Sequence, residues 1–266
     1  MIDHGKKSVV GVMVDAVDYD AAVSRILEAA RQRRSYTVSA LAVHGVMTGV
    51  QNEAHKFRLN SFDLIVPDGQ PVRWALNWVH GMGLPDRVCG TQLTLHALEA
   101  AANERLPVYF YGSTGLILAK LISRLKQLYP ALIVVGAEPS KFRALDAEER
   151  TALADHITQS GASIVFVGLG CPRQEVFAYE MKSLLPMPVM AVGAAFAFLA
   201  GEQARAPEFM QRYGLEWLFR LGMEPRRLWR RYLLLNPCYI CLLVGQFVGK
   251  RFSTTGREPA TEVRYG

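Results

Sequence analysis

The sequence has few cysteines, and this scarcity excludes a fold held together by disulfides. Only four occur among 266 residues, so there is no dense disulfide framework. Cys89 and Cys171 are isolated, which is weak evidence for a reducing compartment. Cys238 and Cys241 match a C-x-x-C pattern, but their flanks are apolar and neither a second pair nor a histidine lies nearby. Two small apolar residues on a helix are therefore favoured over a redox or zinc site.

Long hydrophobic runs are also absent. The longest apolar stretch covers residues 232–248, and Asn236, Pro237 and Gln246 interrupt it. A helix needs roughly 20 apolar residues to span a bilayer, so we expect this stretch to lie on a membrane or to pack on protein. The first residues lead into only a short apolar run, and we expect no signal peptide.

Two nucleotide-binding fingerprints are missing as well. There is no Walker A lysine pattern, and Gly168 and Gly170 are followed by Gln174 rather than by the third glycine of G-x-G-x-x-G. The absence of this fingerprint argues against a dinucleotide-dependent oxidoreductase, which stays an alternative that a cofactor titration would test.

Short β-branched runs alternate with helical patterns along the first 200 residues. The expected strands cover residues 8–14, 36–43, 63–66, 108–111, 132–135, 163–167 and 189–192, and the clearest helices cover 146–159 and 174–184. This alternation predicts an α/β fold, a Rossmann-like parallel sheet with helices on both faces. Composition changes near Gly201 toward Arg, Trp and Leu. We therefore expect a core over residues 1–200 and a helical, membrane-associating appendage over 201–266.

Glycine-containing turns follow four of the expected strands. Ligands of an open parallel sheet bind beyond the carboxyl ends of its strands, and glycine lets the backbone approach a phosphate closely. A strand-to-helix turn also needs glycine for its own geometry, and that alternative stays open for each turn taken alone. The candidate ligand-binding residues of these turns are Gly112, Ser113, Gly168, Gly170 and Gly193.

Three polar side chains stand at these turns. Asp68 follows a strand and precedes Gly69, where a carboxylate can act as a general base. Spacing alone favours an aspartate bonded to its own turn. Gln174 and Glu175 are candidate ligands for sugar hydroxyls, or are simply residues in the first turn of a helix.

Arginines concentrate in the appendage of a chain whose net charge is +6. On a helix beginning at Pro225, four of them fall within one arc of about 140°, opposite Leu228, Trp229, Tyr232 and Leu235. A basic amphipathic helix of this kind is typical of membrane-surface binding, with a solvated face or a nucleic-acid site as alternatives. The clustered arginines are Arg205, Arg212, Arg220, Arg226, Arg227, Arg230 and Arg231.

The chain resembles the WecG/TagA/CpsF glycosyltransferases, glycosyltransferase family 26, over nearly its whole length. The Pro-x-Gln-Glu sequence at 172–175 and the Gly-Leu-Glu-Trp sequence at 214–217, in this order, are the most specific matches. The resembling stretches are residues 64–69, 86–90, 109–113, 167–175, 205–207, 214–221 and 224–226.

The resemblance implies a UDP-sugar donor and an acceptor sugar on polyprenyl (undecaprenyl) diphosphate, in cell-surface polysaccharide or teichoic-acid-type glycan biosynthesis. It implies inversion at the anomeric carbon, no essential metal or other cofactor, and a peripheral place on the cytoplasmic face of the bacterial inner membrane. It also implies Asp68 as the base, a sugar pocket with Thr37, Arg87 and Gln174, and Arg220, Arg227 and Arg230 closing over the diphosphate.

Two positions depart from the family's pattern. Ser39, a further candidate for substrate binding, stands where the family often has asparagine, and Ala197 stands where it often has aspartate. The donor sugar therefore stays open, as does the oligomeric state, a homo-oligomer included. A nucleic-acid-binding module would leave the turns at Asp68 and Gln174 unexplained, and nucleic acid is not an expected partner.

Overall fold

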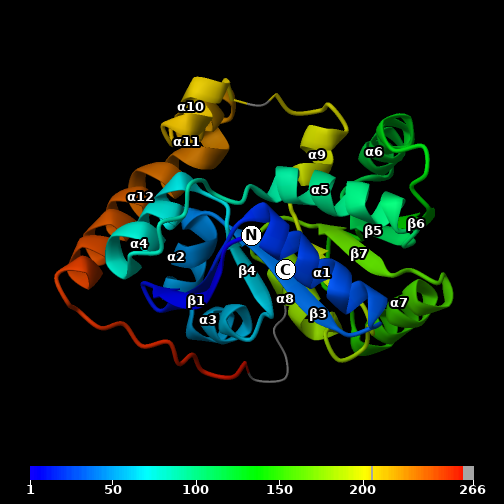
Figure 1. Ribbon diagram of the computed structural model, residues 1–266, viewed down its shortest axis with the longest axis horizontal. Coiled ribbons are helices and arrows are strands. Elements are labelled where there is room, and N and C mark those ends of the chain that lie inside the picture. Colours follow the sequence, from blue (N-terminus) through cyan, green and yellow to red (C-terminus); the bar gives the residue numbers. More distant parts are fainter. Residues whose placement is uncertain (205, 260–266) are drawn as a thin grey trace.

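A six-stranded parallel sheet forms the centre of the protein (Figure 1). The computed structural model describes residues 1–204 and 206–259, without the side chains of Arg227 and Arg231. The strands overlap six of the segments expected from the sequence and lie in the order β4-β3-β8-β7-β5-β6. They are β3 (Tyr36–Leu41), β4 (Leu64–Pro67), β5 (Val108–Gly112), β6 (Val134–Glu138), β7 (Ile164–Gly168) and β8 (Pro188–Ala191).

Helices cover both faces of this sheet, as the alternating pattern predicts. Side chains alternate along β7, so that Val165 and Val167 enter one buried cluster while Ile164 and Phe166 enter the other. On the first face lie α2 (Val43–Gln51), α3 (Glu53–Asn60), α4 (Gln70–His80), α7 (Ala147–Gln159) and α8 (Arg173–Met181). On the second lie α1 (Tyr19–Arg31), α5 (Gly90–Asn103), α6 (Gly115–Leu128) and α9 (Ala195–Leu199).

The expected strand over residues 8–14 is wrong. The chain instead forms an antiparallel hairpin of β1 (Asp3–Val9) and β2 (Val12–Val17), separate from the large sheet. Val10 and Gly11 connect the strands with φ of 52° and 91°. Positive φ at both central residues matches the right-handed twist of paired strands. Valine is common in strands and rarely adopts a positive φ. Its presence at position 10 therefore indicated a strand where the chain turns.

The described part of the chain beyond Gly201 forms three helices and shares the core of the sheet domain. It contains α10 (Glu208–Arg212), α11 (Glu216–Met223) and α12 (Pro225–Phe247), and α12 lies along α4 and α2 (Figure 1). Tyr239 and Leu243 of α12 belong to the buried cluster on the first face. The Gln246 side chain accepts from the Val10 amide at 2.8 Å and donates to the Ser8 carbonyl at 2.8 Å. The C-terminal end of α12 is thereby fixed on the β1–β2 hairpin.

Within residues 1–204 and 206–259, no helix is both long enough and apolar enough to cross a bilayer. The apolar stretch at 232–248 forms most of α12 and turns one side inward, with Tyr232, Tyr239 and Leu243 buried. Trp229, expected on that apolar side, is instead exposed beneath the Arg230 guanidinium. Cys238 and Cys241 are exposed thiols that form no disulfide.

A buried histidine makes the fold sensitive to acid. His55 on α3 is 1 % exposed, and neither ring nitrogen has a hydrogen-bond partner in the described part of the chain. Burial, together with the neighbouring Arg58 charge, lowers the pKa of His55 from 6.5 to about 4. Because the unfolded chain binds this proton more tightly, the stabilisation is complete above pH 6.5 and is lost as the pH falls toward 4.

We expect His55→Phe to remove part of the acid sensitivity of folding. Between pH 7 and pH 5, the unfolding free energy of the unchanged protein should fall by about 2 kcal/mol more than that of the variant. Urea titrations at both pH values measure this difference. The exposed His96 on α5 provides a matched control, since His96→Gln should keep the unchanged protein's pH dependence. Equal pH dependence in His55→Phe and the unchanged protein would contradict the assignment.

Candidate functional site

Asp68 lies directly after β4, at the carboxyl edge of the sheet. Its Oδ1 accepts the Gly90 amide N–H at 2.9 Å, at the first residue of α5. Its own amide donates to the Leu41 carbonyl at the end of β3, at 3.1 Å. The carboxylate therefore bridges to another element instead of closing its own turn, so the turn interpretation favoured by spacing alone is wrong. Within the part of the chain that the structure describes, no hydrogen bond to the other oxygen, Oδ2, is found, so this oxygen can take a further partner.

Two arginines and one glutamate surround Asp68. The Arg87 Nη1 donates to the Asp68 carbonyl at 3.2 Å, and its Nη2 pairs with Glu216 Oε2 at 2.8 Å. Arg220 Nε lies 3.9 Å from the other oxygen of Glu216. Burial raises the pKa of the Asp68 carboxyl, while the charges of Arg87 and Arg220 act in the opposite direction. Glu216 and Arg220 belong to α11, so the appendage completes the surroundings of Asp68.

The glycine turns after β5 and β7 lie side by side. Gly112 and Gly168 are paired in register, and a Cβ on Gly112 would lie 2.7 Å from the Gly168 carbonyl oxygen. The Ser113 amide donates to that same carbonyl at 2.9 Å. Gly170 and Gly193, with φ of 79° and 55°, form the turns after β7 and β8. These four glycines thus allow a close approach of backbone at the edge where ligands bind.

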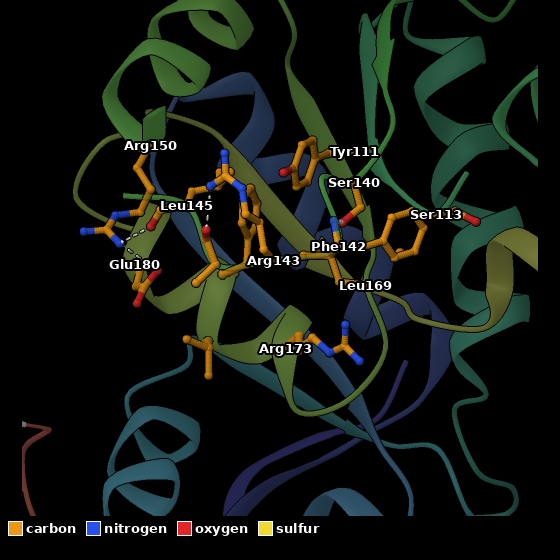
Figure 2. Close-up of a pocket in the computed structure, with 14 residues that line it drawn as sticks. Tyr111, Ser113, Ser140, Phe142, Arg143, Leu145, Arg150, Leu169, Arg173 and Glu180 are labelled. Atoms are coloured by element: carbon orange, nitrogen blue, oxygen red, sulfur yellow. Dashed lines mark hydrogen bonds and ion pairs between the residues drawn. The ribbon is translucent and has the colours of Figure 1, made fainter. Parts of the chain in front are cut away.

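A cavity of about 240 Å³ opens beside these turns. The chain leaves β5 toward β6 and leaves β7 toward β8, in opposite directions, so the cavity stands where the winding of the sheet reverses. Figure 2 shows Tyr111, Ser140 and Phe142 along it, with Arg173 at the start of α8 below. An aromatic and cationic cavity at this point can hold the base and phosphates of a nucleotide.

The structure does not bring every expected residue to this edge. Thr37 is buried near the start of β3, where its Oγ1 donates to Asp63 at 2.9 Å. The parallel register pairs Leu41, at the end of β3, with Pro67, the residue before Asp68. Thr37, near the start of β3, therefore lies toward the opposite edge of the sheet from Asp68. Arg230 lies on the exposed outside of α12, over the Trp229 ring. The side chain of Arg227 lies outside the described residues.

Ser39, Gln174 and Glu175 come together, but beneath the surface. Their exposures are 0 %, 4 % and 0 %. The Ser39 hydroxyl and the Gln174 amide both donate to Glu175 Oε1, at 3.0 and 2.8 Å. In this arrangement Glu175 contacts other side chains of the protein and does not reach open space.

Several residues at the site escaped the sequence analysis. Glu216 pairs with Arg87 across 129 positions of sequence, and no local pattern reveals such a contact. Phe142 and Arg143 come from the connection after β6, which carries no glycine to mark it as a ligand turn. The position of this connection at the carboxyl edge, next to β5, was the signal that could have found them.

The fold and the site together define an α/β protein with a doubly wound sheet, whose carboxyl edge carries a cavity and, at one end, a buried carboxylate with two arginines nearby. The sequence profile of the Glycosyl transferase WecG/TagA/CpsF family matches residues 7–253. The chain is 33 % identical over 192 residues to an N-acetylglucosaminyldiphosphoundecaprenol N-acetyl-beta-D-mannosaminyltransferase of Bacillus spizizenii, covering 72 % of each protein. The chain belongs to the WecG/TagA/CpsF family and is a glycosyltransferase.

Proposed function

We propose that this protein transfers a sugar from a UDP-sugar, with inversion, to a sugar carried on polyprenyl diphosphate. The observation that carries the proposal is the position of the buried Asp68 carboxylate beside Arg87 and Arg220, at one end of the carboxyl edge of the sheet. The name of the Bacillus spizizenii relative describes transfer of a mannosaminyl group to an acceptor on diphosphoundecaprenol. We infer an acceptor of the same class, in glycan biosynthesis at the cell envelope.

The donor lies along the sheet edge in this proposal. The uridine occupies the cavity between β5 and β7, next to Tyr111 and Phe142. The diphosphate crosses the glycine turns at Gly170 and Gly193, and the sugar reaches Asp68. Strand β4 is three strands from β7, and neighbouring strands are about 4.8 Å apart, which gives roughly 14 Å. An extended nucleoside diphosphate sugar is about that long, so one donor molecule spans the edge.

Asp68 is the base of a single displacement. It takes the proton from an acceptor hydroxyl while that oxygen forms a bond to the anomeric carbon. The bond from this carbon to the diphosphate oxygen breaks on the opposite side, and UDP departs with the bonding electrons. Arg87 and Arg220 stabilise the negative charge that develops on UDP, and their contacts with Glu216 hold them in position before the reaction begins.

Because arginines neutralise the departing diphosphate in this mechanism, transfer should continue in excess EDTA. Asp18 and Asp20 form one short Asp-x-Asp sequence, but the Asp18 carboxylate caps α1 and pairs with the amino terminus. We expect initial rates with and without EDTA to agree within about twofold. Loss of activity on chelation, restored by Mg²⁺ or Mn²⁺, would contradict the mechanism.

The outer side of α12 is proposed to rest on an anionic membrane. Its exposed apolar side chains lie along the outer side of the helix, and the exposed cations Arg226, Arg230, Lys250 and Arg251 lie near its two ends. Apolar side chains enter the boundary between headgroups and acyl chains, and each cation adds about 1 kcal/mol of attraction to anionic lipid. The apolar members are Trp229, Leu233, Leu234, Ile240, Val244, Phe247 and Val248. This contact would hold the protein at the inner face of the bacterial cytoplasmic membrane, beside its acceptor.

Titration calorimetry with UDP, NAD and a DNA duplex tests the ligand class directly. We expect saturable UDP binding, and Phe142→Ala should weaken it because the aromatic ring lines the proposed uridine cavity. Tight NAD binding, or DNA binding that falls steeply with salt, would favour the two rival classes instead. The exposed Leu116 on α6 lies outside the cavity and supplies the control Leu116→Ala, which should bind UDP normally.

A further inference from the structure

The buried carboxyl group of Glu175 stands between the two halves of the site. Its Oε1 accepts from the Ser39 hydroxyl of β3 and from the Gln174 amide of α8. Ser39 is in register with Ile65 of β4 on one side and with Ala191 of β8 on the other. Glu175 therefore links the strands that lead to Asp68 with the helix that begins beside the nucleotide cavity.

The Gln174 side chain contacts two of the glycine turns. Its Oε1 accepts the Gly170 amide N–H at 3.1 Å, and its Nε2 also donates to the Ala191 carbonyl at 3.3 Å. A Cβ on Gly193 would lie 2.9 Å from the same Oε1, so the turn after β8 packs directly on this amide. Both amide hydrogens of Gln174 are engaged within the protein, which leaves it little capacity to donate to a sugar.

Burying Glu175 is costly in free energy, so its presence calls for a role. No hydrogen-bond partner reaches its Oε2 in the described part of the chain, and an unsatisfied buried polar atom destabilises a protein. Burial raises the pKa of the carboxyl, which favours its neutral form. A neutral carboxyl group can still accept at Oε1, and a glutamine side chain in its place would do the same.

We propose that Glu175 is a positioning residue: with Ser39 it fixes the Gln174 amide, and Gln174 in turn sets the Gly170 and Gly193 turns on which the donor diphosphate lies. This inference rests on the proposed function, because the turns matter to turnover only if the donor crosses them. It assigns to Gln174 and Glu175 a supporting role beneath the donor instead of direct contact with sugar hydroxyls. A displacement of these turns by about 1 Å is enough to lower turnover strongly.

The experiment compares four full-length variants by donor kcat/KM per folded molecule, with melting temperature measured on the same samples. Glu175→Ala removes the acceptor and should lower kcat/KM at least tenfold, and up to about a hundredfold. Glu175→Gln keeps the acceptor without the charge and should stay within about threefold of the unchanged protein. Ser39→Ala removes one hydrogen bond to the Glu175 carboxyl group and should cost about fivefold. Asp155→Asn, an exposed change on α7, is the control and should have no effect.

The outcomes separate this inference from the proposed function. If the unchanged protein transfers no sugar from any UDP-sugar, the proposed function fails and this inference fails with it. If the unchanged protein transfers sugar and folded Glu175→Ala does so equally fast, only this inference is overturned. Variants with lower melting temperatures but normal kcat/KM would show a purely structural role. If Glu175→Ala does not fold, Ser39→Ala decides, and full activity in that variant would overturn the proposal.

Discussion

Replacing Asp68 by asparagine is expected to lower kcat by about 10²-fold or more, the usual contribution of a general base. Asparagine keeps the size of the side chain, and its Oδ1 can still accept the Gly90 amide N–H. Folding and UDP binding should therefore be retained, and only the ability to take a proton is lost. Steady-state turnover, together with a UDP titration on the same protein, separates these effects. Asp20→Asn, an exposed change on α1, should behave like the unchanged protein.

The pH dependence of activity in the unchanged enzyme is a second test of Asp68 as the base. Burial raises its pKa, and a base works only when deprotonated. An ordinary aspartate has a pKa near 3.9, so activity should fall on acidification at a pH above that value. Near-normal turnover in a folded Asp68→Asn protein would contradict the assignment, whatever the shape of the profile.

Arg220→Ala is expected to reduce turnover by about 10²- to 10³-fold while changing vesicle binding little. A contact to a developing anion in the transition state contributes about 3–4 kcal/mol, whereas one surface cation contributes only about 1 kcal/mol to lipid attraction. Arg220 lies near Asp68, 3.9 Å from Glu216 and over the Phe198 ring of α9. Arg230 lies on the outside of α12, so Arg230→Ala should weaken vesicle binding more than it weakens turnover.

Both arginine variants should be measured in the full chain, with a water-soluble acceptor for turnover and anionic vesicles for binding. Removing the appendage beyond Gly201 is a poor substitute, because Tyr239 and Leu243 would leave the buried core. If Arg220→Ala transfers sugar to the soluble acceptor at the normal rate, the appendage serves only as a membrane contact.

The parallel sheet could be predicted because buried strands have a strong local signature. Runs such as residues 163–167 are β-branched on both faces, and the helical segments between them fix a parallel order. Asp68 could be found for the same reason, since it follows such a run. The hairpin turn at Val10 could not, because its positive φ goes against the preference of valine.

The partners of the site residues could not be predicted from the sequence. Arg87 meets Glu216, and Ser39 meets Glu175, only after the chain has wound around the sheet. Thr37 is a residue for which the resemblance and the structure differ. The resemblance implied a place in a sugar pocket, whereas the register of β3 puts Thr37 toward the opposite edge of the sheet, beside Asp63. Local spacing identifies the ends of strands, and tertiary packing decides which side chains meet there.

The most direct test of the central proposal is product analysis after incubating the protein with UDP-sugars and a polyprenyl diphosphate-linked sugar, in the presence of EDTA. We predict that one UDP-sugar yields free UDP and a lipid-linked disaccharide in equal amounts. The new bond should have the anomeric configuration opposite to that of the donor. A product that retains the donor's configuration would contradict the single displacement at Asp68, and no product from any UDP-sugar would contradict the proposed function.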